Sequence, residues 1–347
     1  MKTVAIIGAS GYVGNHLVKA LAPLFQVIAL TRNDNPIVRE VSGVEYLSIS
    51  KCTRTFDIII NTSFSSAKEP KLFEQENLHM LKVIQSLSLP HSHIVHLSSL
   101  AVFGFALDRD IQPTSLPNRA DYPYVRSKLH MENLLLQQFS TKSLSIVRLG
   151  NIWGPANQSW TQPVTDAIVW GLPVLSKHHT CSNLTYVHNI TSYLLHIIQS
   201  EQHQTFHHLA EHHNISWQQV IDEIGLHLQL KPQPIDTIPF YPLTITDEVS
   251  HAVWQGPVNM MRMLKSGRFT STKFPASILS LSVWLKSLSD KTSFPLPPHQ
   301  TDPVFYWVLT TQKPFTNHLL KDWQPPYTWE QASKQTLLWL DEAGYTA

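Results

Sequence analysis

The sequence has little charge and almost no charge imbalance. Charged residues make up 15% of its 347 residues, and 26 basic residues stand against 25 acidic ones, which gives a formal net charge of +1. This balance supplies neither a basic surface for nucleic acid nor an acidic surface for a basic partner. We therefore expect a small-molecule substrate and no nucleic-acid partner.

Cysteines and long apolar runs are also scarce. Only Cys52 and Cys181 occur, without a CxxC pair, which indicates neither a disulfide framework nor a zinc site. The 19 histidines form no convergent ligand set, so no metal is expected. The nearest approach to a membrane span, residues 278–288, is too short and contains Lys286. We expect a cytoplasmic protein without a transmembrane segment.

Short apolar runs rich in β-branched residues alternate with helix-length segments through the first half of the chain. Continuous apolar runs predict strands that are buried on both faces and connected by helices. The pattern therefore predicts an α/β fold with a doubly wound parallel sheet. The predicted strands are residues 3–7, 26–30, 57–61, 93–97 and 145–148, and the predicted helices are 14–24, 69–87, 123–139, 216–228 and 328–343.

The alternation of strands and helices ends near residue 155. Beyond it, prolines cluster at 231–242 and 294–303, which is typical of irregular structure. We predict a dinucleotide-binding domain over residues 1–155, to which residues of about 183–215 return, and a smaller C-terminal substrate lobe over residues 156–347.

A glycine motif with GxxGxxG spacing follows the first predicted strand and opens the first predicted helix. The first glycine permits a tight turn, the second lets backbone N–H groups approach a pyrophosphate, and the third allows close packing of helix and strand. The helix N-terminus then faces the anion. The predicted cofactor-binding residues here are Gly8, Ser10, Gly11, Tyr12, Val13 and Gly14.

The end of the second predicted strand carries Thr31 and Arg32. NAD-selective sites usually have an acidic residue at this place for the ribose hydroxyls, whereas an arginine can neutralise a 2′-phosphate. We therefore predict an NAD(P) cofactor with a preference for NADP. The alternative interpretation is that Arg32 is a solvated loop charge.

Tyr124 and Lys128 stand four residues apart at the start of a predicted helix, so they share one face. A phenol with a pKa near 10 is a poor acid or base at neutral pH unless a positive charge stabilises the phenolate. Ser99, at the end of an apolar strand, offers a hydroxyl to a substrate oxygen. These three residues are the catalytic candidates.

In order and spacing, these motifs resemble the extended short-chain dehydrogenase/reductases of the NAD-dependent epimerase/dehydratase superfamily. Ser99 precedes Tyr124 by about the 25 residues usual in that family, and residues 57–61, 76–78 and 148–155 match further family motifs. The fourth-strand motif departs from the family, because Asn61, Thr62 and Ser63 stand where His and Ala are usual.

The resemblance implies roles for individual residues. Tyr124 would be the general acid in reduction or the base in oxidation, Lys128 would lower the pKa of that tyrosine and hold the ribose, and Ser99 would polarise the carbonyl. A homodimer through the helices beside Glu76 and Tyr124 is also implied. The further residues implied to contact cofactor are Thr62, Ser63 and Asn77, and those implied to contact substrate are Leu100 and Asn151.

Two interpretations of the substrate remain open. Residues 183–189 and the C-terminal tail resemble the 3β-hydroxysteroid dehydrogenase-like branch, which predicts an alcohol–ketone oxidoreductase acting on a bulky apolar substrate. The alternative is a nucleotide-sugar epimerase or dehydratase with a tightly held NAD(P). That alternative needs cations for a diphosphate, and the candidates in the substrate lobe are Lys177, Arg262, Lys265 and Arg268.

A third interpretation is a non-catalytic protein that senses a dinucleotide. Sensors of this kind commonly lose the catalytic tyrosine. The presence of Ser99, Tyr124 and Lys128 together argues against this interpretation.

Overall fold

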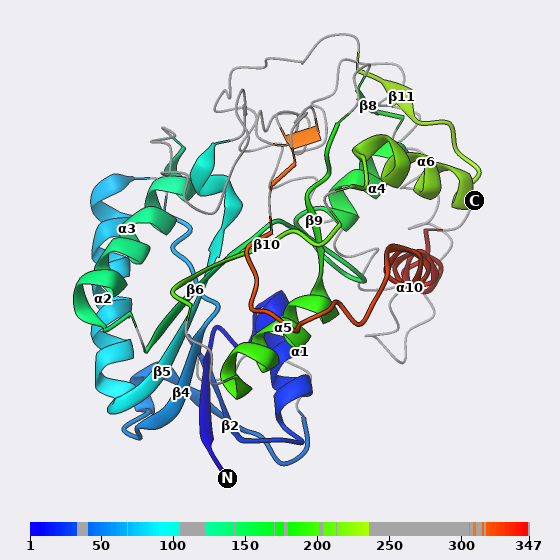
Figure 1. Ribbon diagram of the computed structural model, residues 1–347. Helices are drawn as coiled ribbons and strands as arrows, with labels where there is room; N and C mark the ends of the chain where they lie inside the picture. The colour runs from blue at the N-terminus through cyan, green and yellow to red at the C-terminus, as the bar shows by residue number, and fades with distance from the viewer. Residues whose placement is uncertain are drawn as a thin grey trace, which may run out of the picture.

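The computed structural model describes residues 1–32, 41–67, 69–104, 122–141, 143–169, 171–176, 180–200, 204–212, 214–235, 305, 308–309, 314–315 and 317–345. Neighbouring strands of its central seven-stranded sheet all pair in parallel (Figure 1). The strand order is β10 (Phe206–Leu209), β6 (Leu144–Leu149), β5 (Ser88–Ser99), β4 (Phe56–Asn61), β1 (Thr3–Ile7), β2 (Gln26–Thr31) and β3 (Glu45–Ser48).

Helices cover both faces of this sheet. On one face α1 (Tyr12–Leu21) packs beside α5 (Val187–Gln199), and on the other α2 (Pro70–Leu87) packs beside α3 (Pro123–Gln138). Successive side chains of β1 alternate between two cores: Val4 and Ile6 join the α1 and α5 side, and Ala5 joins the α2 and α3 side. Both faces are therefore buried, and the predicted doubly wound α/β fold is confirmed.

The remaining described elements surround a second hydrophobic core. Three tryptophans, Trp153, Trp217 and Trp329, are buried in it. Two short sheets lie here, one of β7 (Asn151–Trp153) with β9 (Leu184–Tyr186) and one of β8 (Pro173–Leu175) with β11 (Gln233–Pro234). The helices of this part are α4 (Thr161–Val169), α6 (Trp217–His227) and α10 (Trp329–Glu342).

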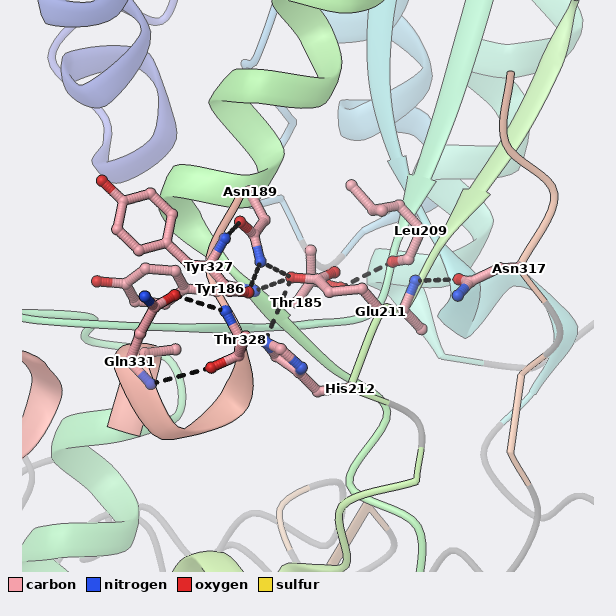
Figure 2. Close-up of polar contacts among 12 residues, drawn as sticks. Thr185, Tyr186, Asn189, Leu209, Glu211, His212, Asn317, Tyr327, Thr328 and Gln331 are labelled. Atoms are coloured by element: carbon pink, nitrogen blue, oxygen red, sulfur yellow. Dashed lines mark hydrogen bonds and ion pairs between the residues drawn. The ribbon is translucent and has the colours of Figure 1, made fainter. Parts of the chain in front are cut away.

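Asparagine side chains join the C-terminal part of the chain to helix α5 and to the end of strand β10 (Figure 2). Asn189, in the first turn of α5, accepts a hydrogen bond from the Tyr327 backbone N–H at 3.0 Å and donates to the Tyr327 carbonyl at 2.9 Å. Asn317 accepts from the backbone N–H of Ala210, just after β10, at 2.7 Å. These amides satisfy backbone groups that no strand partner reaches.

Several boundaries differ from the sequence prediction. Strand β3 is not among the predicted strands because it is a short edge strand, in which Glu45 is exposed, Tyr46 and Leu47 are half-buried and only Ser48 is buried. Strand β5 begins five residues earlier than predicted, at Ser88, in a polar stretch. Helix α1 begins at Tyr12, so its first turn already contains Gly14.

Some predictions fall outside the described residues, namely the apolar stretch 278–288 and the basic candidates Lys177, Arg262, Lys265 and Arg268. Among the helices that are described, none has the length and apolar character needed to cross a membrane.

Candidate functional site

Two positions at the turn between β1 and α1 have no room for a side chain. Gly8 has a φ of +81°, and a Cβ there would lie 2.6 Å from Thr62 Oγ1. A Cβ on Gly14 would lie 2.2 Å from the Gly8 carbonyl oxygen. Both positions therefore require glycine, for the left-handed turn and for the close approach of helix to strand.

The first turn of α1 presents backbone N–H groups without a capping side chain. Gly11 is the N-cap residue, and no side chain caps the helix. The first N–H groups of a helix have no partner within it and form a site for an anion. Tyr12 is anchored by its hydroxyl to the Pro155 carbonyl at 2.9 Å, Val13 is buried in the core, and Ser10 is exposed.

A cavity of about 580 Å³ extends along the carboxyl ends of the strands. Arg32 and Ser50 line it near β2, and Asn77 and Lys128 line it near α2 and α3. The Asn77 amide also donates to the Ser127 carbonyl at 2.9 Å, which ties α2 to α3. The uncapped helix and the glycine turn fit a pyrophosphate, and the cavity brings together Arg32, Ser63, Asn77 and Lys128 of the predicted site. The residues of the glycine turn, Ser99 and Tyr124 are not among those that line it.

Thr31 has a structural contact instead of facing this cavity. Its hydroxyl donates to the Leu47 carbonyl at 3.3 Å and its side chain is buried between β2 and β3. Thr31 is thus not among the residues lining the cavity, whereas its exposed neighbour Arg32 is.

The unusual end of β4 forms its own polar network. Thr62 donates to the Ile7 carbonyl at 2.9 Å, and Ser63 donates through Oγ to Asn61 Oδ1 at 2.7 Å. The Asn61 amide nitrogen lies 3.1 Å from Nδ1 of the buried His96. Burial lowers the pKa of His96 well below its usual value, and the positive charge of Lys128 lowers it further.

Ser99, Tyr124 and Lys128 come together at the carboxyl end of β5. The Ser99 and Tyr124 side chains share a hydrogen bond. Lys128 Nζ donates to the Leu97 carbonyl at 2.8 Å and lies 5.9 Å from the centre of the Tyr124 ring. The i, i+4 spacing on α3 therefore places phenol and ammonium on the face that meets β5.

Burial dominates the acid–base properties of this group. It raises the pKa of Tyr124, and the hydrogen bond with Ser99 opposes that rise. It lowers the pKa of Lys128 to about 8, and attraction to the Glu132 carboxylate opposes that fall. The net direction for Tyr124 is upward, unlike the lowered pKa that the family resemblance implied.

The two predicted substrate residues differ in accessibility. Asn151 is half-buried, and its amide donates to the Ser182 carbonyl at 2.7 Å. Leu100 is only 1% exposed and packs with Val102 and Phe103, so its side chain is part of the interior.

Sequence reasoning missed two residues that lie near the group of Ser99, Tyr124 and Lys128. Phe64 packs edge-on against Tyr124, with ring centres 5.6 Å apart, and its ring centre lies 5.3 Å from Lys128 Nζ. Glu132 is buried one turn beyond Lys128. The i, i+4 spacing could have indicated Glu132, but no local pattern indicates Phe64.

Two solved structures with a similar fold over nearly the whole chain are dehydratases of nucleotide sugars. The dTDP-glucose 4,6-dehydratase of Bacillus anthracis, in complex with NAD, is 12% identical, with a TM-score of 0.60 over 100% of this chain and 99% of that one. An NAD-dependent NDP-hexosamine 5,6-dehydratase of tunicamycin biosynthesis is 16% identical, with a TM-score of 0.59 over 98% of each chain.

A third solved structure matches a smaller part of the chain. The UDP-glucuronic acid 4-epimerase of Bacillus cereus, with UDP-glucuronic acid and NAD, is 13% identical, with a TM-score of 0.54 over 67% of this chain and 85% of that one. At these identities the likeness concerns the fold. No curated protein sequence matches the chain.

The family itself is shown by sequence. The model of the NAD dependent epimerase/dehydratase family matches residues 4–203, which is more than half of the 347 residues. The matched region contains the glycine turn, the cavity and the Ser99, Tyr124 and Lys128 group. The chain belongs to the NAD-dependent epimerase/dehydratase family of extended short-chain enzymes.

Proposed function

We propose that the protein interconverts an alcohol and a ketone on a small-molecule substrate, with NAD(P) as hydride carrier and Ser99, Tyr124 and Lys128 as the proton relay. The observation that carries this proposal is the group of Ser99, Tyr124 and a buried Lys128 at the carboxyl end of β5, in which Lys128 lines a cavity that Arg32, at the end of β2, also lines.

Each member of the relay has a task that its surroundings support. The bound nicotinamide would exchange hydride with the substrate carbon. The raised pKa keeps the Tyr124 hydroxyl protonated, so it can donate its proton to a ketone oxygen. Ser99 hydrogen-bonds the same oxygen, and the Lys128 ammonium stabilises the phenolate that remains.

The resemblance of residues 183–189 to the 3β-hydroxysteroid dehydrogenase-like branch supports a bulky, apolar substrate. In the structure this segment forms β9 and the start of α5, and β9 pairs with β7, which begins at Asn151. Asn151 is thereby held beside the segment that resembles this branch.

NADP preference is a further part of the proposal and depends on Arg32. Its side chain is exposed at the end of β2 and lines the cavity together with Ser50. Arg32→Ala should weaken NADPH binding about tenfold or more and NADH binding much less, because a charged hydrogen bond contributes about 1.5–3 kcal/mol. Arg54→Ala, which removes a guanidinium already paired with Glu45 at 2.6 Å, is the control. Titration calorimetry that shows equal losses for both cofactors would contradict the preference.

A nucleotide-sugar epimerase is the second candidate, and the family match favours it. In that reaction the cofactor would be reduced and reoxidised within one turnover. A dehydratase must also eliminate water with a further acid, but the turn of 3₁₀ helix directly after Ser99, Leu100–Phe103, is entirely apolar. This observation argues against a dehydratase and leaves the epimerase as the competing reaction.

One assay separates the two candidates. Purified protein is mixed with NADPH or NADH and a panel of apolar ketones, steroid ketones and UDP- or dTDP-sugars, and absorbance is followed at 340 nm. Stoichiometric loss of absorbance with a ketone is expected. Conversion of a nucleotide sugar without net loss of absorbance would replace this proposal with the epimerase reaction.

The assembly and compartment of the enzyme belong to the same proposal. We infer a homodimer through α2 and α3, since Leu72 and Leu78 of α2 are 48% and 44% exposed. Light scattering on purified protein tests it, and a monomeric mass would contradict it. The sequence contains only two cysteines, Cys52 and Cys181, far apart and without a CxxC pair, which supports a reducing, cytoplasmic setting.

A further inference from the structure

A buried carboxylate joins three elements directly behind the candidate relay. Glu132, on α3, has a side chain that is 3% exposed. It accepts two hydrogen bonds from Arg148 of β6, from Nη2 to Oε2 at 2.6 Å and from Nε to Oε1 at 3.1 Å. It also accepts from the Ser98 hydroxyl of β5 at 2.5 Å. The carboxylate thus joins α3, β5 and β6.

These contacts reach both sides of the relay. Ser98 stands between Leu97, whose carbonyl accepts from Lys128, and Ser99, whose side chain hydrogen-bonds Tyr124. Glu132 follows Lys128 at i+4, so the two side chains share one face of the helix. The carboxylate therefore acts on the lysine through its charge and on Ser99 through Ser98 and the β5 backbone.

Burying the ion pair of Glu132 and Arg148 costs desolvation free energy. A contribution to folding stability does not by itself explain why these two charges are buried here. Desolvation of two charges commonly cancels their attraction, and apolar residues of similar size often stabilise a core equally well. The Glu132 carboxylate does, however, oppose the loss of the Lys128 charge in its dry surroundings. A protonated lysine is what the relay requires.

The other ionisable groups nearby stay uncharged or already paired. His208 of β10 lies 3.4 Å from Arg148, and burial with repulsion by Arg148 and His318 lowers its pKa to about 3. His96 of β5, beside Lys128, is likewise held neutral. Burial also keeps Tyr124 protonated. The electrostatic balance at Lys128 therefore depends on Glu132.

We propose that Glu132 is a positioning residue for the reaction, keeping Lys128 charged and, through Ser98, holding residues 97–99 against Lys128 and Tyr124. The role of Lys128 in catalysis rests on the proposed function. The effect of Glu132 on the charge of Lys128 does not, and it can be measured on protein without cofactor or substrate.

The test is an NMR titration of protein labelled at lysine ¹³Cε, with the Lys128 signal assigned by its absence in Lys128→Met. Glu132→Gln should lower the pKa of Lys128 by about one unit, the smaller end of the effect of a close opposite charge. Glu132→Asp should restore most of the difference. Glu74→Gln, on the exposed side of α2, should leave the pKa unchanged.

A second variant covers the case in which Glu132→Gln does not fold, because an unpaired buried Arg148 is strongly destabilising. Glu132→Gln with Arg148→Met removes both charges and should lower the pKa of Lys128 in the same direction. An unchanged pKa in whichever variant folds would overturn the proposal. So would a wild-type Lys128 that is already neutral at pH 7. If the enzyme assay fails while the pKa falls as expected, the proposed function is wrong but the electrostatic link stands.

Discussion

At the scale of single residues, burial decides the protonation states at the candidate site. Lys128 is buried and Tyr124 is half-buried, which favours the neutral phenol and weakens the ammonium. Two opposing contacts moderate these effects, namely Ser99 on the tyrosine and Glu132 on the lysine. The site is thus prepared for proton donation, not for strong base catalysis.

Tyr124→Phe tests the proton donor. The variant should lower kcat by at least about 10²-fold, the usual contribution of a general acid or base, with little change in cofactor affinity. Steady-state kinetics and fluorescence titration with NAD(P)H measure the two effects. Tyr122→Phe, with its ring 6.5 Å from that of Tyr124, is the matched control and should retain activity. Substantial activity in Tyr124→Phe would assign proton transfer to another group.

Glu211 provides a pH-dependent test of buried charge. One carboxylate oxygen, Oε1, accepts from the Tyr186 backbone N–H at 2.6 Å and from the Asn189 amide at 3.2 Å (Figure 2). Oε2 has no hydrogen-bond partner among the described residues. Burial raises the pKa of Glu211 to about 7 from 4.5. The folded state therefore binds the proton more tightly than the unfolded state, and stability falls as pH rises from about 4.5 through 7.

Glu211→Gln should remove this pH dependence, because glutamine keeps an acceptor for Tyr186 and carries no charge. The variant should be more stable than the wild type by roughly 1–3 kcal/mol at pH 8, with a difference that shrinks toward pH 5. Thermal unfolding of both proteins across this range measures it. A difference that is constant with pH would show that Glu211 does not titrate there.

At the scale of elements, two glycines of the β1–α1 turn are required for different reasons. A Cβ on Gly14 collides with the Gly8 carbonyl at 2.2 Å, whereas a Cβ on Gly11 would lie 3.1 Å from the same oxygen and meets no other atom within 4 Å. Gly14 is thus required by helix–strand packing. Gly11 faces the place where a pyrophosphate would approach.

The variants Gly14→Ala and Gly11→Ala should therefore affect different properties, the first folding stability and the second cofactor binding. Gly14→Ala should lower the free energy of unfolding by roughly 2–4 kcal/mol, since backbone must shift in a packed core. Gly11→Ala should change it by less than about 1 kcal/mol but weaken cofactor binding. Urea denaturation and calorimetry with NAD(P)H give the two quantities. Equal loss of stability in both would place Gly11 in the packing as well.

At the scale of the whole molecule, the C-terminal helix completes the second core. Trp329, at the start of α10, is 7% exposed, packs against Trp153 with ring centres 6.4 Å apart, and donates to Glu223 Oε1 at 2.9 Å. Residues near the end of the chain thereby close a core that begins at β7. Its stability depends on contacts between distant parts of the sequence.

Trp329→Ala should lower the free energy of unfolding by about 3–5 kcal/mol, through the lost burial and the cavity that remains. Leu338→Ala on the same helix is the control, because Leu338 is 52% exposed and should change stability by less than about 0.5 kcal/mol. Denaturant unfolding compares the two variants. A similar small effect for both would mean that α10 contributes little to this core.

Local patterns were sufficient for five of the seven strands of the sheet, all but β3 and β10, for the glycine turn and for the pairing of Tyr124 with Lys128. Buried parallel strands read as continuous apolar runs, a phosphate-binding turn needs glycines at set positions, and a four-residue spacing places two side chains on one helix face. Each of these features is decided within a few residues of chain, so the sequence alone could predict it.

Only tertiary structure decided which distant groups share a buried site. Ser98, Glu132 and Arg148 are separated by 34 and 16 residues, and Asn189 meets Tyr327 across 138. Glu211 looks like an ordinary surface carboxylate in the sequence, yet the fold encloses it at the start of α5. Burial and partners, not residue type, set the charge of such groups, and both arise only when elements far apart in the chain pack together.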